Sequence, residues 1–158
     1  MAEISMDVAR GQMLAVLKEA FEGPSESWSY FTDHGVDAGL LGTLSGLNAA
    51  RASRLWGGSS IAAHAHHAAF GLAASSAWIR GDRVSRDWRE SWRVSTVDDA
   101  AWAQLFEQLR HGYTDLRQAI ESHGFSSAEA MGGAVGAIAH AAYHLGAIRQ
   151  KVAASRNA

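Results

Sequence analysis

The chain contains no cysteine and only one proline among its 158 residues. Without cysteine it can form no disulfide, and it offers no thiolate to a metal and no thiol nucleophile to a substrate. Any metal that binds must therefore be held by nitrogen and oxygen donors. The single proline, Pro24, leaves the rest of the chain free of the residue that most strongly disfavours a helix.

The chain also lacks a strong excess of charge and a long apolar run. Its formal net charge is −2, and lysine and arginine form no stripe, which argues against binding to nucleic acid or to an anionic membrane. No segment reaches the apolar length of a membrane span, and the first ten residues lack the unbroken apolar stretch of a signal peptide. The expected compartment is therefore the cytoplasm.

The composition predicts one helical domain. With 158 residues, of which 47% are hydrophobic, the chain is long enough for one compact core and short for two. Alanine is abundant, and no segment shows sustained two-residue alternation with β-branched residues. We therefore predict a single all-α domain that spans residues 1–158.

Apolar residues at three- and four-residue spacing predict four long helices and one shorter helix. The long helices are expected at about 5–22, 60–79, 96–124 and 126–154, and the shorter one at about 37–53. Gly57 and Gly58 are interpreted as part of the start of the second long helix. Four glycines of the last helix predict that a neighbouring backbone approaches it closely: Gly132, Gly133, Gly136 and Gly146.

Histidines provide the strongest functional signal. His140 and His144 are four residues apart in the last predicted helix, so their imidazoles lie within about 40° of each other around the helix. A second cluster, His64, His66 and His67, lies in the second long helix. A ligand from that cluster would complete a three-histidine set with an open coordination position, which is typical of catalytic rather than structural metal sites.

Spacing alone leaves the upstream ligand open between His64 and His67. These two are three residues apart and share a helix face, whereas His66 points about 100° away from His67 and is expected at the surface. The simpler interpretation is that the buried histidines are hydrogen-bonded core residues, but their alanine-rich surroundings offer few partners for an imidazole. Three further histidines show no ligand spacing and are expected at the surface or at helix ends: His34, His111 and His123.

The segment 82–96 carries Trp88 and Trp92 among charged residues. This amphipathic composition is typical of a segment that covers an opening rather than one that fills a core. We therefore expect a lid in which the two tryptophans contact a substrate or pack at a dimer interface. Charged residues of this segment are candidates for an acid, a base or a substrate clamp, although a charged loop is usually only solvated: Asp87, Arg89 and Glu90.

Two segments carry a family resemblance. The run from Ser60 to His67, SIAAHAHH, and the run from His140 to Gly146, HAAYHLG, resemble those of the DinB-like superfamily of damage-inducible B proteins and thiol-dependent enzymes. The resemblance covers most of the chain. It implies a four-helix bundle with up-down-down-up topology, a short extra helix after the first one, and a homodimer.

The resemblance also implies a ligand set. His67, His140 and His144 would hold the metal, and His64 would lie one turn earlier, facing the ligands or the substrate. Relatives of this kind catalyse metal-dependent transfer or opening reactions with bacillithiol- or mycothiol-type thiols. The chain departs from many relatives after the last histidine, because Leu145, Gly146 and Ala147 stand where those relatives carry Arg-Gly-Gln. Any polar role of those side chains is absent here.

Two function classes follow. In the first, the protein binds a divalent metal, with zinc or nickel favoured over iron. Three neutral imidazoles would leave the metal its full charge, so that it acts as a Lewis acid on a small-molecule substrate. The protein would then be a thiol-dependent transferase or a hydrolase, with a low-molecular-weight thiol as a candidate cofactor. In the second, the protein is a noncatalytic helical dimer that keeps a structural or vestigial histidine site, since no general base is evident beside the ligands.

Overall fold

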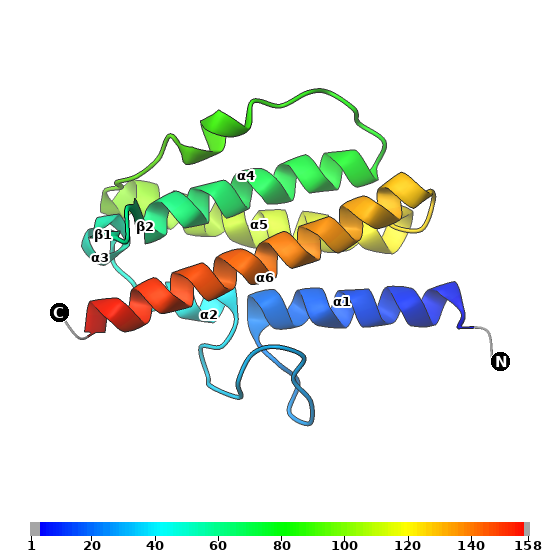
Figure 1. Cartoon of the computed structure of the whole chain (residues 1–158), viewed down its shortest axis with the longest axis horizontal. Helices are drawn as coiled ribbons and strands as arrows, with labels where there is room; N and C mark the ends of the chain where they lie inside the picture. The colour runs from blue at the N-terminus through cyan, green and yellow to red at the C-terminus, as the bar shows by residue number, and fades with distance from the viewer. Residues whose placement is uncertain (1–3, 157–158) are drawn as a thin grey trace.

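The computed structural model describes residues 4–156 and confirms the all-α prediction. Four long helices account for most of it: α1 (Met6–Glu22), α4 (Ile61–Ile79), α5 (Asp99–His123) and α6 (Ala128–Arg156). They lie side by side (Figure 1), with α4 packed against both α5 and α6, and with α1 packed against α5 and α6. The smaller elements are α2 (Leu40–Ser45), α3 (Ala49–Ser53), β1 (Leu55–Trp56), β2 (Ser59–Ser60) and the 3₁₀ helix η1 (Trp88–Trp92).

Side-chain caps fix where the long helices begin. The Ser60 hydroxyl accepts a hydrogen bond from the Ala63 amide at 3.0 Å, and the Asp98 carboxylate accepts one from the Ala101 amide at 2.8 Å. Each bond satisfies one of the backbone N–H groups that the first turn of a helix leaves without a partner. The third long helix therefore begins at Asp99, after its Asp98 cap, rather than at Thr96 as the sequence predicted.

The predicted helix at 37–53 is wrong as a single element, because it is interrupted between α2 and α3. The interpretation of Gly57 and Gly58 as a helix start is also wrong. Both have positive φ angles, 59° and 86°, and they form the turn of a two-stranded hairpin in which Trp56 pairs with Ser59. A two-residue turn of this kind needs left-handed backbone at both positions, which glycine adopts without strain.

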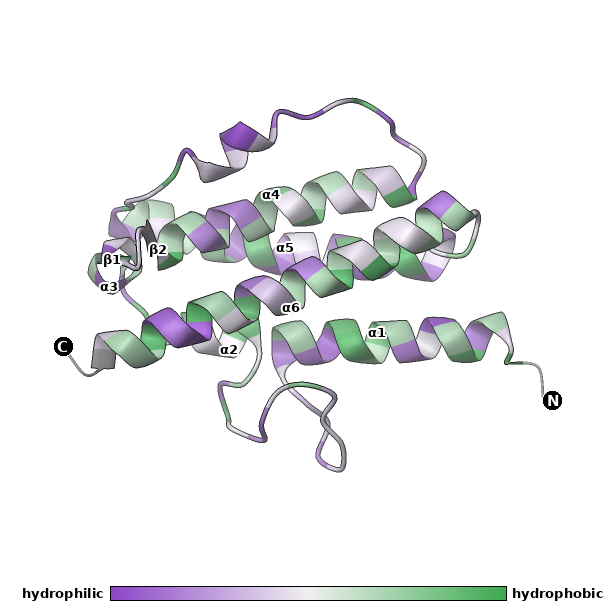
Figure 2. Ribbon diagram, viewed as in Figure 1, coloured by the Kyte–Doolittle hydropathy of each residue, from purple (hydrophilic) through white to green (hydrophobic). Residues whose placement is uncertain are grey.

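The hydrophobic core lies between the four long helices. Helix α4 is buried along most of its length, and its alanines let α5 and α6 approach it closely. In Figure 2 the segment that arches over α4 is coloured mostly hydrophilic, whereas α4 carries long stretches of hydrophobic residues. No helix within residues 4–156 is long and apolar enough to cross a membrane.

The glycines of α6 do not face a neighbouring backbone, so that prediction is wrong. A Cβ atom at Gly132, Gly136 or Gly146 would meet nothing within 4 Å, because these residues lie on the exposed face of the helix. Gly133 alone among the four has a close neighbour, and that neighbour is the Trp78 side chain rather than a backbone.

A buried carboxylate, Glu19, organises the segment between α1 and α2. The Glu19 side chain is almost fully buried and accepts hydrogen bonds from the amides of Tyr30, Phe31 and Thr32 at 2.7 to 2.9 Å. The hydroxyls of Ser29 and Thr32 donate to the same carboxylate. Burial alone would raise the pKa of Glu19. The hydrogen bonds outweigh this effect and lower the pKa to about 2. The segment is therefore held by an ionised group that no motif in the sequence indicated.

Candidate metal centre

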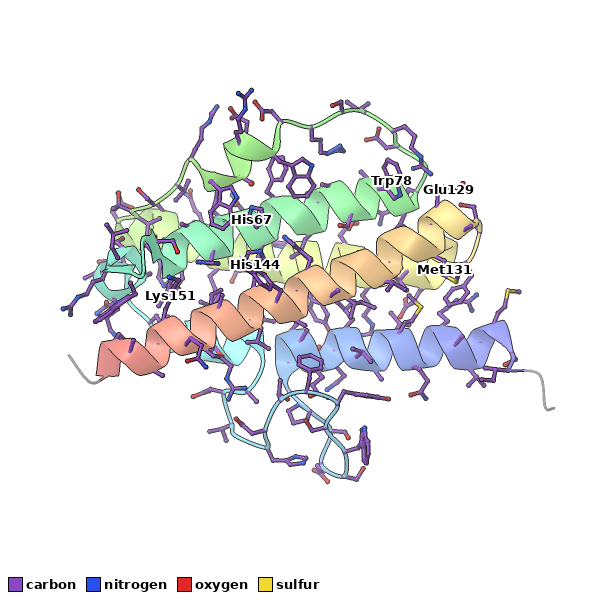
Figure 3. All side chains as sticks on the ribbon, in the orientation of Figure 1. His67, Trp78, Glu129, Met131, His144 and Lys151 are labelled. Atoms are coloured by element: carbon purple, nitrogen blue, oxygen red, sulfur yellow. The ribbon has the colours of Figure 1, made fainter. Side chains whose placement is uncertain are left out.

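Three histidines from two helices converge between α4 and α6. His67 of α4 and His140 and His144 of α6 each offer one ring nitrogen, and these three nitrogens lie within 4.8 Å of one another. Figure 3 shows His67 and His144 in the space between the two helices. The Nε2 atoms of His67 and His140 are 2.9 Å apart, close to the separation of about 3.3 Å between two nitrogens of a tetrahedral zinc site. This cluster could hold a metal ion.

The three imidazoles are uncharged near neutral pH. Burial, together with repulsion from the neighbouring imidazoles, lowers the pKa of His67 to about 4 and that of His144 to about 3. Burial also lowers the pKa of His140. A histidine binds a metal only in its neutral form, through a ring nitrogen with a free lone pair. The site is therefore preorganised for a cation and disfavours protons.

Ser91 of η1 fixes the proton of His67. The Ser91 hydroxyl donates its one hydrogen to the Trp88 carbonyl at 2.6 Å, so at 2.6 Å from His67 Nδ1 it can only accept. His67 therefore carries its proton on Nδ1, and the lone pair of Nε2 faces His140. The Ser91 carbonyl also accepts a hydrogen bond from His66 Nδ1 at 2.7 Å, and the His66 side chain is half-buried.

Replacing Ser91 by alanine should weaken zinc binding by about 10- to 100-fold, the usual cost of removing a group that orients a metal ligand. The change removes the acceptor that holds the His67 tautomer and leaves the three histidines in place. Isothermal titration with zinc measures the effect. Ser85→Ala, an exposed serine of the same segment, serves as the matched control. Equal affinities for the two variants would contradict a role for Ser91 in orienting His67.

His64 lies beside the cluster rather than within it. Its Nδ1 atom is 3.0 Å from Nδ1 of His144, and its Nε2 atom is 3.0 Å from the Ser59 hydroxyl. The Lys151 ammonium donates to the carbonyl of Ser59 at 3.1 Å, at the hairpin end of the site. Between the two alternatives that spacing left open, the structure therefore groups His67 with the α6 pair, and His64 is placed to orient the His144 ring.

Gly71 makes room for the His140 ring. A Cβ atom built on Gly71 would lie 2.6 Å from Cε1 and 2.9 Å from Nδ1 of His140, which is too close for any side chain. A glycine inside a helix costs about 1 kcal/mol relative to alanine, and here it allows an imidazole to lie directly on the backbone of α4. Sequence reasoning missed this residue, because it lies on a different helix from the ring it accommodates.

The two tryptophans of the predicted lid lie against the histidines. The Trp92 ring stacks on the His67 ring with centroids 4.2 Å apart and meets the His64 ring edge-on at 5.4 Å. The Trp88 ring lies 5.9 Å from that of His67 and 6.4 Å from that of His140. Both indoles remain about half exposed, so each has one face toward the cluster and one toward solvent.

The charged residues of the same segment do not join the site. The Asp87 carboxylate pairs with the Arg89 guanidinium at 2.9 Å, and Glu90 pairs with Arg93. The hydrogen bond from Arg89 accordingly lowers the pKa of Asp87. None of these groups is part of the histidine cluster, so they remain a solvated surface. His34, His111 and His123 are exposed, as expected.

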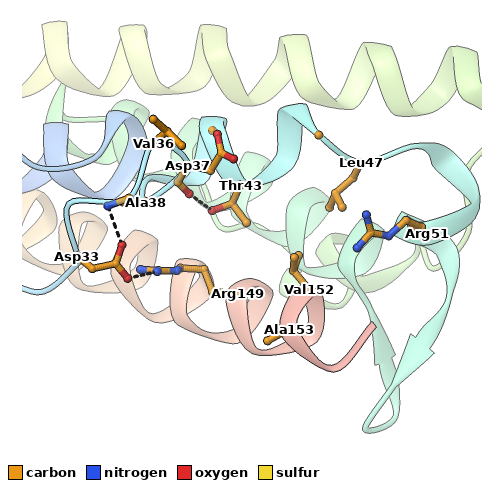
Figure 4. A pocket seen from close by; sticks show the side chains of 13 residues that line it. Asp33, Val36, Asp37, Ala38, Thr43, Leu47, Arg51, Arg149, Val152 and Ala153 are labelled. Carbon is orange, nitrogen blue, oxygen red and sulfur yellow. Dashed lines mark hydrogen bonds and ion pairs between the residues drawn. The ribbon is translucent and has the colours of Figure 1, made fainter. Parts of the chain in front are cut away.

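A separate pocket of about 350 Å³ lies between the segment 33–47 and the end of α6 (Figure 4). It is lined by Asp33, Arg51 and Arg149 among others, and by no histidine. The Arg149 guanidinium pairs with Asp33, and that of Arg51 donates to the Ser155 hydroxyl at 2.9 Å. Both arginines are thus already paired, and with no histidine in its lining the pocket is no candidate for the metal.

No protein-family model, curated protein or solved structure matches this chain.

Proposed function

We propose that this protein binds one divalent metal through His67, His140 and His144 and is a metal-dependent enzyme of the DinB-like superfamily. The observation that carries the proposal is the convergence on one point of three uncharged imidazoles from two helices, two of them buried and that of His140 half-buried. Two facing ring nitrogens 2.9 Å apart must share either a proton or a cation. A third imidazole at the same point and pKa values far below the usual range favour the cation.

The course of the helices supports the superfamily assignment. In Figure 1 the colours show α1 and α6 running in one direction and α4 and α5 in the opposite direction. This order corresponds to an up-down-down-up four-helix bundle, with α2 and α3 as the extra short helices after the first one. Sites built from facing helices of a bundle are a recurrent arrangement for metals.

The donor set fits zinc or nickel. Imidazole suits both metals, and an all-nitrogen set with no carboxylate argues against the harder cations magnesium and calcium. When bound, such an ion would act as a Lewis acid and would stabilise the thiolate of a low-molecular-weight thiol or activate water. Ser91 and His64 would hold the ligand rings in place, and Trp88 and Trp92 would limit access of bulk water. Three protein ligands is also the number found in catalytic zinc sites.

The reaction we propose is thiol-dependent transfer or hydrolysis on a small molecule. The charged residues next to the site pair with one another, so no carboxylate of the covering segment is placed as a general base. A thiol of suitable pKa would need no such base, because the metal itself would favour its ionised form. The same observation favours the second candidate, a structural or vestigial site without catalysis.

Zinc should bind at one equivalent per chain and stabilise the protein, as measured by isothermal titration and thermal unfolding of tag-free protein. At a free zinc concentration a hundred times the dissociation constant, we expect the melting temperature to rise by about 5 to 10 °C. Because the pKa values of His67 and His144 are lowered to about 4 and 3, binding should persist at pH 5.5, where ordinary imidazoles are protonated. Failure to bind zinc, nickel or cobalt at pH 7 would refute the proposal.

Binding of cobalt distinguishes a catalytic metal site, which has an open coordination position, from a closed structural one. In the cobalt-loaded protein, addition of a low-molecular-weight thiol should produce a new sulfur-to-metal absorption band if a coordination position is accessible. A closed structural site would bind cobalt but show no change with thiol. The structural site would also need a fourth protein ligand. His64 is the nearest imidazole, so in that case His64→Ala would lower metal affinity as strongly as loss of one of the three ligands.

A further inference from the structure

A second pocket adjoins the candidate metal centre. It has a volume of about 380 Å³ and lies between the second half of α4, the segment 82–88 and Gly133 of α6. Trp88 lines this pocket and also lies against His67 and His140, so one indole borders both sites. The volume is in the range of pockets that bind small molecules.

The pocket and the histidines lie along the same two helices, α4 and α6. Along α4, His67, Gly71, Ala74 and Trp78 follow at intervals of three or four residues and so share a helix face. Ala74 and Trp78 line the pocket, whereas His67 belongs to the cluster. Gly133 precedes His140 by seven residues, which corresponds to about 10 Å along a helix. The pocket and the cluster are therefore about 10 Å apart along α6, and Trp88 borders both.

Trp78 forms a rigid end wall. Its indole nitrogen donates to the Glu129 carbonyl at 3.2 Å, and its ring lies directly on α6 at Gly133, where a Cβ atom would be only 2.7 Å away. The guanidinium of Arg83 lies over one face of the ring, 4.0 Å from its centroid. Figure 3 shows Trp78 beside Glu129 at this end of α4. The wall is flat and aromatic, and it is held along its pyrrole edge by α6 and on one face by Arg83.

The polar groups of the pocket favour an anion. Its charged lining residues are Asp82, Arg83 and Arg86, with a net charge of +1. Arg86 pairs with Asp82 at 2.9 Å, whereas Arg83 donates to the backbone carbonyls of Trp78 and Asp82. The charge of Arg83 is thus not neutralised by a carboxylate of the lining. A planar guanidinium stacked on an indole presents its free N–H groups to a carboxylate in the plane of a flat ring.

We propose that this pocket binds the non-reacting end of the substrate of the metal centre, and that this end is a planar aromatic carboxylate. The inference rests on the proposed function for its link to the histidines. The indoles of Trp78 and Trp88 contact the ring, Arg83 binds the carboxylate, and the rest of the molecule extends past Trp88 toward His140.

The experiment measures binding of 2-naphthoate to the full chain by isothermal titration, first with EDTA and then with zinc. Its uncharged counterpart, 2-naphthamide, and the non-planar cyclohexanecarboxylate serve as comparison probes. We expect one site per chain for 2-naphthoate with EDTA present, and affinity at least about tenfold lower for the amide and for Arg83→Gln. Arg93→Gln, an exposed arginine of the same segment outside the pocket, should leave the affinity unchanged.

Equal binding of 2-naphthoate and 2-naphthamide, or equal binding to wild type and Arg83→Gln, would overturn the assignment of an anionic ligand. Failure of 2-naphthoate to bind wild-type protein would overturn the proposal that this pocket binds a ligand. Zinc titration of Arg83→Gln separates these outcomes from failure of the proposed function, because that variant keeps all three histidines and should bind zinc like wild type.

The link to the metal is tested by replacing zinc with cobalt, whose binding the absorption spectrum confirms. At about 10 Å the paramagnetic ion should shift the NMR signals of bound 2-naphthoate, whereas zinc should not. Binding to the cobalt-loaded protein without such shifts would place the ligand elsewhere and overturn the proposal. If the protein binds 2-naphthoate through Arg83 but binds no metal at all, the proposed function fails and the pocket loses its role in that reaction.

Discussion

Replacing His144 by alanine should lower zinc affinity by more than about a hundredfold, which exceeds the usual cost of losing a group that only orients a ligand. His144 is almost fully buried and its ring contacts those of His67, His140 and His64, so its loss removes a donor from the centre of the cluster. The thermal stabilisation by zinc should disappear together with the binding. Isothermal titration and thermal unfolding of the same protein sample measure both effects.

His111→Ala is the matched control for this variant. His111 is an exposed histidine of α5 outside the cluster, so its loss should leave zinc affinity and the rise in melting temperature unchanged. A His144→Ala protein that folds, as judged by circular dichroism, and binds zinc like the control would rule out the three-histidine site. His140→Ala provides an independent check, because it removes a different ligand from the same helix.

Replacing Glu19 by glutamine should lower the free energy of unfolding at pH 7 by about 3 kcal/mol. The carboxylate has a pKa of about 2 in the folded protein against 4.5 for the free group, a difference that corresponds to about 3 kcal/mol. An amide also brings two N–H donors into a place where the amides of Tyr30, Phe31 and Thr32 already donate. Urea denaturation followed by circular dichroism measures the difference.

The pH dependence of the free energy of unfolding tests whether the ionised Glu19 carboxylate causes this difference. Because the folded pKa of Glu19 is lowered, its contribution is fully present above about pH 5 and is lost as the pH falls toward 2. Wild-type protein should therefore lose stability over this range more steeply than Glu19→Gln, and the two curves should converge at low pH. Glu26→Gln, an exposed position in the same connecting segment, should follow wild type throughout. Parallel curves for wild type and Glu19→Gln would contradict an ionised, hydrogen-bonded carboxylate.

The periodicity of apolar residues was sufficient to predict the long helices, and residue spacing was sufficient to predict that the two α6 histidines point in the same direction. His140 and His144 share a helix face because they are four residues apart. The apolar residues of α5 form one stripe because one side of it is buried, whereas α4 is apolar nearly all round because it is buried on several sides. The upstream candidate ligand could not be chosen from the sequence, because His64 and His67 share a face of α4 and differ only in their position along it relative to α6. Spacing within one helix carries no information about that position.

The residues that sequence reasoning missed act across the fold. Ser91 contacts His66 and His67 from a 3₁₀ turn 24 or 25 positions away, in a segment with no periodic pattern. Glu19 lies in an amphipathic helix and has the appearance of a surface residue until the segment after Pro24 folds over it. Gly57 and Gly58 were misinterpreted for a different reason, since a glycine pair before a serine fits both a hairpin turn and a helix start.

Gly71 has a consequence for anyone who transplants this site into another protein. Three histidines grafted onto a pair of neighbouring helices would reproduce the donors but not the gap in α4 on which the His140 ring lies. An alanine at that position would push the imidazole off the axis shared with His67. A faithful graft therefore has four residues rather than three, and the fourth contributes by having no side chain.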